Sequence, residues 1–202
     1  KLQDLVALLS GRNFETKQYE EAIVEESFNR LRQGIVRFMN ETHFKRFIMI
    51  IRSAGFVSPS LIGSQTALNF AYILYLTLRD AGVDDATIER QVRRWFALSI
   101  LTGRYSGSPE SAIDYDIRQI QQQGFSSFIE NTISAELSDA FWDYGLPQKM
   151  ETSSATSPHF AMFRAAQVKL SDRGFLSSDI SVRELVEIKS DIQHLFPKDY
   201  LK

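Results

Sequence analysis

The stretch SQTALNFAYILYLTLRDAG, residues 64–82, decides the fold class. Ser64 belongs to the residue types that favour a helix N-cap, and Gly82 to those that favour a helix end. The densest apolar run, residues 68–78, is about half as long as the roughly 20 residues that a membrane span needs. The stretch therefore predicts a buried helix over 65–81.

The next stretch, VDDATIERQVRRWFALSILTG at residues 83–103, predicts a second helix. We expect Asp85 to cap this helix, which then covers 86–102, and Gly103 to end it. Two successive helices joined by only a few residues pack nearly antiparallel. The two stretches together thus predict a helical hairpin.

Helical patterns continue on both sides of this hairpin. Apolar residues at steps of one, three and four predict a long amphipathic helix over 19–39. Extended residues are expected only after Gly174. The pattern predicts an all-α, multi-helix bundle-like domain with a short extended element near the C-terminus. The remaining helices are expected at 2–10, 42–52, 109–123, 125–134, 135–144, 158–170 and 182–189. Pro147 stops the pattern after the helix at 135–144, and a Ser181–Glu184 capping box begins the helix at 182–189. Extended residues are expected at 175–180 and 191–196.

The amino-acid composition limits the classes of function that the chain can have. The chain has 202 residues, and its 23 Lys and Arg against 25 Asp and Glu give a net charge of −2. This charge gives no global electrostatic reason to expect nucleic-acid binding. The sequence has no cysteine, which excludes disulfides, thiolate zinc sites and cysteine nucleophiles, and is compatible with a reducing cytosol. We expect a cytoplasmic protein without membrane association.

Six short stretches, in their order along the chain, resemble one family. The chain is similar to the region between the two named domains of GmrSD-like proteins, which are modification-dependent restriction endonucleases. Those proteins have an N-terminal ParB/sulfiredoxin-like domain that hydrolyses nucleotides and a C-terminal HNH nuclease domain. The resemblance covers essentially the whole chain. The stretches are LSGRNFET at 9–16, RWF at 94–96, LTGRYSGSPE at 101–110, AQVK at 166–169, GFLS at 174–177 and DIQHLFPKDYL at 191–201.

The resemblance implies a domain organisation and an origin. Residues 1–174 would be the helical middle domain, and residues 175–202 the truncated start of the HNH nuclease domain. The chain would be a helical connector or regulatory fragment of a DNA restriction protein. Its partners would be the other domains of the parent chain, and DNA through the parent. The family's Asp-Gly-Gln-Gln-Arg-like nucleotide motif does not occur in this sequence.

The resemblance also implies one catalytic residue. His194 matches the general base of an HNH site, and Gln193 stands where a metal-binding histidine is usual. The Asn and His that complete such a site would lie beyond Lys202. We therefore expect no nuclease activity, metal or cofactor in this chain, whereas the parent would use a divalent metal and a nucleoside triphosphate.

A second candidate site is a cluster of arginines that we call the arginine corner: Arg93, Arg94, Arg104, Tyr105 and Arg118. Guanidinium groups next to the amides of a helix start form a reasonable receptor for phosphate or carboxylate. The alternative is that the arginines pair with nearby acids and carbonyls and hold the corner together. The sequence favours this structural interpretation.

The remaining polar and aromatic residues suggest structure rather than chemistry. His43 and His159 are isolated and have no metal-ligand spacing. Seven aromatic residues fall within apolar helical patterns and are expected in the core: Phe70, Tyr72, Tyr75, Trp95, Phe96, Phe141 and Trp142. Two other functions stay open beside the connector. One is a non-enzymatic helical protein–protein interaction module, and the other an anion- or nucleotide-sensing domain that uses Arg94, Arg104 and Arg118.

Overall fold

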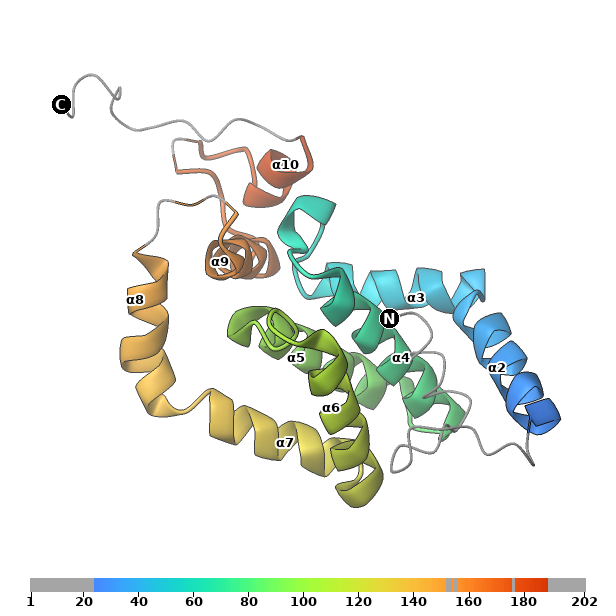
Figure 1. Ribbon diagram of the computed structural model, residues 1–202. Coiled ribbons are helices and arrows are strands. Elements are labelled where there is room, and N and C mark those ends of the chain that lie inside the picture. Colours follow the sequence, from blue (N-terminus) through green and yellow to red (C-terminus); the bar gives the residue numbers. More distant parts are fainter. Residues whose placement is uncertain (1–23, 152–153, 155, 176, 189–202) are drawn as a thin grey trace.

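The structure, a computed structural model, describes residues 24–151, 154, 156–175 and 177–188 (Figure 1). Over these ranges the chain forms helices and no strand, so the predicted all-α class is confirmed for this part of the chain. None of the described helices is both long enough and apolar enough to cross a bilayer. The helix expected at 2–10 and the extended segment expected at 191–196 lie outside the described residues.

The helical elements follow one another with short connections. In chain order they are α2 (Val24–Phe38), α3 (Glu41–Ser53), the 3-10 turn η2 (Pro59–Leu61), α4 (Gln65–Asp80), α5 (Asp85–Thr102), α6 (Pro109–Gln123), α7 (Phe125–Glu136), the π-helical turn η3 (Phe141–Gly145), α8 (Leu146–Met150), α9 (Pro158–Lys169) and α10 (Val182–Glu187).

The predicted hairpin is α4 and α5, which pack against each other at the centre of the molecule (Figure 1). Ser64 caps α4 by accepting a hydrogen bond from the Ala67 amide at 3.2 Å. Gly103 ends α5 in the left-handed conformation, with φ of 64°. The predicted cap of α5 is wrong by one residue. Asp84, not Asp85, accepts the hydrogen bond of the Thr87 amide at 2.9 Å.

One hydrophobic core connects the helices. Phe47 of α3, Trp95 of α5, Ile117 of α6 and Ala165 of α9 all have no exposed surface. They belong to one continuous cluster, which α4 enters with buried residues on nearly every side. A helix that is apolar all round is typical of a buried central element. The prediction that residues 68–78 form a buried helix is therefore confirmed.

The helix expected over 135–144 does not form as one element. The chain turns after α7 at Leu137, and η3 and α8 then run on together. Pro147 does not stop this pattern, because it lies in the first turn of α8, where a helix needs no amide donor. Two aromatic residues of η3 also depart from the prediction. Phe141 is only half-buried, and Trp142 is 47% exposed.

The last described segment packs back onto the helical body. The predicted capping box of α10 is confirmed, with Ser181 and Glu184 bonded to each other's backbone amides. Within the extended element expected at 175–180, residues 177–180 form a turn instead, since the Ser177 hydroxyl accepts the amides of Asp179 and Ile180. It is flanked by one isolated bridge between Arg173 and Ser181.

Candidate functional site

The arginine corner is built around Asp116, a carboxylate of α6 with no exposed surface. Arg104 donates from Nε to Asp116 Oδ2 at 2.9 Å and from a terminal nitrogen to Oδ1. The Tyr105 hydroxyl donates to the same Oδ2 at 2.7 Å. Arg104 also pairs with Glu136 at the end of α7. Arg104 thus joins α6 and α7, and Tyr105 bonds to α6.

Local structure sets this geometry. The left-handed turn at Gly103 lets the Arg104 amide donate to the Ser99 carbonyl at 3.1 Å, which turns the chain out of α5. The Arg104 side chain then lies over the Trp95 ring, with 5.0 Å between guanidinium carbon and ring centroid. Stacking of this kind is favourable for a guanidinium that has lost its water.

The titration behaviour of the corner follows from its burial. Burial opposes the charge of Arg104, but the hydrogen bonds and charge of Asp116, with the charge of Glu136, hold the pKa of its guanidinium above the usual value. Burial, and then the negative charge of Asp116, raise the pKa of Tyr105 well above its usual value. Arg104 is therefore charged, and Tyr105 keeps the proton that it donates.

The other predicted arginines point elsewhere. Arg94 lies on α5 and forms a two-bond ion pair with Glu130 of α7, which lowers the pKa of that carboxyl. Arg93 donates to the Ser53 hydroxyl of α3 at 3.2 Å. Arg118 is exposed on α6, where its Nε donates to the Asp114 carbonyl at 3.3 Å.

The corner thus divides into a buried and an exposed part. Arg104 and Tyr105 converge on Asp116, which is the pairing that the structural interpretation predicts for Arg104. The guanidinium groups of Arg94 and Arg93 lie toward α7 and α3. Their assignment as ligand-binding residues stays a prediction.

The predicted catalytic residue His194 lies outside the described residues, as does Gln193. Among the residues that the structure describes, no three His, Asp or Glu side chains are grouped so as to hold a metal ion. His43 and His159 are separate, since His43 lies beside the Tyr75 ring at 6.4 Å between ring centroids, whereas His159 is on α9.

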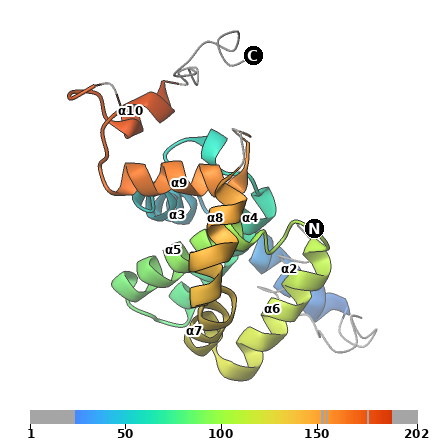
Figure 2. The ribbon, with the colours of Figure 1, turned by 90° about the vertical axis from the view of Figure 1, so that its left-hand side faces the viewer.

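The sequence did not predict an apolar pocket of about 480 Å³ between α5, α7, α8 and α9. In Figure 2, which looks onto this side, α8 stands between α9 and α7. Trp142 and Phe163 line the pocket and are each nearly half exposed. Its apolar wall includes Leu98 and Leu101 of α5, Ile133 of α7, Leu146 of α8 and Met162 of α9.

Two polar side chains, Arg94 and His159, also line this pocket. The ring nitrogen Nε2 of His159 is buried and has no hydrogen-bond partner among the described residues. Burial, and then the charge of Lys149, lower the pKa of His159 below its usual value. The imidazole is therefore neutral at pH 7, and its unpartnered Nε2 can accept a hydrogen bond.

Only one sequence signal hinted at this pocket. The adjacent Phe141 and Trp142 were assigned to the core, yet the break after α7 leaves Phe141 half-buried and Trp142 exposed. A pair of large aromatic residues shortly before Gly145 and Pro147 is compatible with either outcome.

In comparisons with protein-family models, curated proteins and solved structures, no match to this chain was found.

Proposed function

We propose that this chain is the helical connector of a GmrSD-like DNA restriction protein, in which it holds the nucleotide-hydrolysing domain and the nuclease domain in a fixed relation. The observation that carries the proposal concerns residues 101–110, which are the longest stretch among the described residues that resembles the family. Its Arg104 and Tyr105 are bound to the buried Asp116. A connector that holds two domains in a fixed orientation needs rigid contacts of this kind between its helices.

The segment after Gly174 gives a second support. The resemblance assigns the residues from 175 onward to the start of the nuclease domain. Val182 and Val186 of α10 belong to the common core, and Glu187 pairs with Arg52 of α3 at 2.8 Å. A nuclease domain that began here would leave the helical body from an anchored helix, so its orientation would follow that of the body.

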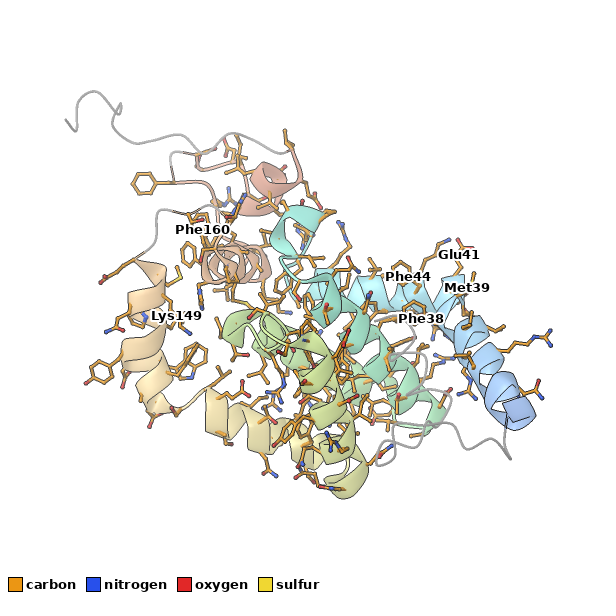
Figure 3. All side chains as sticks on the ribbon, viewed as in Figure 1. Phe38, Met39, Glu41, Phe44, Lys149 and Phe160 are labelled. Carbon is orange, nitrogen blue, oxygen red and sulfur yellow. The ribbon has the colours of Figure 1, made fainter. Side chains whose placement is uncertain are left out.

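The interaction module remains the second candidate because of exposed apolar side chains on α2 and α3. Val36, Met39 and Met49 are 65%, 75% and 69% exposed. Figure 3 places Met39 and Phe44 beside the junction of these helices. Single exposed apolar residues are normal, but neighbouring ones, such as Met39 and Phe44 at this junction, are typical of a contact surface. Such a surface also suits a connector, which must contact its neighbouring domains.

The anion sensor has less support. Arg94 and Arg104 are engaged with Glu130, Asp116 and Glu136, so an anion would have to displace these carboxylates. Arg118 is exposed, and its Nε donates to the Asp114 carbonyl.

The coding sequence on either side of this chain tests the connector proposal directly. We expect an Asp-Gly-Gln-Gln-Arg-like nucleotide motif before Lys1 and a completed HNH site after Lys202, in a protein of cytoplasmic location. Flanks that lack both would contradict the proposal. We also expect the purified chain, with magnesium or manganese, to leave modified and plain DNA intact. Metal-dependent cleavage that a His194→Ala variant loses would show a complete site within this chain.

A further inference from the structure

The pocket between α5, α7, α8 and α9 has the dimensions of a ligand site. Its volume of about 480 Å³ lies within the range of roughly 300 to 1,000 Å³ that is usual for small-molecule pockets. Its wall comes from four helical elements, so it is not a groove along one helix. Binding pockets of this kind combine an apolar wall with a few polar groups that orient the ligand.

The polar groups of the pocket restrict what it would bind. Arg94 is neutralised by its two-bond pair with Glu130, so its guanidinium does not select an anionic ligand. His159 is neutral, so its buried and unpartnered Nε2 can accept a hydrogen bond. A ligand that offers a donor to Nε2 would use this acceptor.

A buried acceptor without a partner is unfavourable, and its presence in a folded protein needs an explanation. An ordered water would need two to four polar partners to replace bulk solvent. The pocket wall is mostly apolar and includes Leu101, Met162 and Trp142. A ligand that is apolar apart from one N–H or O–H group satisfies Nε2 and also covers this wall.

We propose that this pocket binds a neutral, apolar small molecule that donates one hydrogen bond to Nε2 of His159. The pocket shares Arg94 with the arginine corner, and the proposal does not depend on the connector assignment. Because α8 forms one wall, a bound molecule would fix α8 against α5 and α9. A ligand at this place would thus stabilise the folded chain by mass action.

A pair of matched probes tests the proposal on the full chain. We would measure binding of 5-fluoroindole and of 5-fluoro-1-methylindole by ¹⁹F NMR. The two share an apolar ring system, but only the first has an N–H donor. We expect 5-fluoroindole to bind about 3- to 10-fold more tightly, as one hydrogen bond provides.

Variants of the chain show whether the two probes bind in this pocket. In His159→Phe the two probes should bind with equal affinity, because the acceptor is gone while the wall remains apolar. Ala166→Trp places a large side chain in the pocket from an exposed position of α9, and should abolish binding of both probes. His43→Phe is the matched control, since His43 also has a buried nitrogen without a partner and lies outside this pocket. It should leave both affinities unchanged.

Several results would overturn the proposal. These are no binding of either probe, equal affinity of the two probes for the unaltered chain, or binding that persists in Ala166→Trp. Self-association that rises with concentration and disappears in Ala166→Trp would show that a second copy occupies the pocket instead. The probe comparison uses the unaltered protein, so it decides the question even where a variant fails to fold.

Discussion

The surroundings of Asp116 determine how much stability the chain loses when a residue of the arginine corner is substituted. Its carboxylate has no exposed surface and is balanced by Arg104 and the Tyr105 hydroxyl. Removing one partner of a buried ion pair leaves a charge without compensation. We therefore expect Arg104→Ala to lower the free energy of unfolding by about 3 kcal/mol, measured by urea denaturation.

Arg118→Ala is the control variant for Arg104→Ala. Arg118 is exposed and bonds a backbone carbonyl of its own helix, so its loss should change stability by at most about 0.5 kcal/mol. The same variants should be tested for salt-dependent binding of DNA and of nucleotide. Unchanged stability of Arg104→Ala together with lost binding would make the corner an anion site and contradict the structural interpretation.

The close contact between the end of α3 and α9 leads to a prediction about the stability of the packing between these two helices. Gly55 has φ of 100°, and a Cβ atom at this position would lie 1.9 Å from the Ala165 carbonyl oxygen. Gly55→Ala would combine a strained backbone with a clash against the backbone of α9. We expect it to lower the free energy of unfolding by more than about 2 kcal/mol.

Gly82 offers a matched control for this prediction. It also has a positive φ, of 73°, but a Cβ atom there would have no heavy atom within 4 Å. Gly82→Ala should therefore cost only the backbone strain, about 1 kcal/mol. Thermal unfolding of both variants, followed by circular dichroism, measures the difference. Equal losses would mean that α3 and α9 separate without cost and that the close approach is not needed.

The continuity of the core leads to a prediction for the whole molecule. Val186 of α10 is 1% exposed and shares one cluster with Trp95 of α5, although the predicted domain boundary at 174 lies between them. Val186→Ala should lower the stability of the entire molecule by about 2 kcal/mol. Unfolding followed by the fluorescence of Trp95, in a Trp142→Phe background, should show this loss.

Ile188→Ala provides the comparison, because Ile188 is 75% exposed directly after α10. It should leave the Trp95 transition unchanged. If Val186→Ala also left that transition unchanged, α10 would unfold independently of the helical body. The segment from residue 175 would then be a separate unit, and the anchored start that we propose for the nuclease domain would be wrong.

The sequence by itself determined the fold class and most helix ends among the described residues. Ser64, Gly103 and the Ser181–Glu184 box were all predicted, because a helix end depends on a capping side chain or a left-handed glycine and on backbone groups within four residues. Asp84 and Asp85 could not be told apart, since both are good caps and only the backbone turn selects one.

Only the tertiary structure decided how distant residues meet. Arg104 pairs with Glu136, 32 positions along the chain, and no local pattern marks that acid as its partner. The pocket around His159 needs four elements in place, and it exists because the chain turns at Leu137 and leaves Trp142 at the surface. Caps and turns depend on neighbours in sequence, whereas ion pairs and pockets depend on how whole helices pack. The pattern of residues along the chain constrains that packing only weakly.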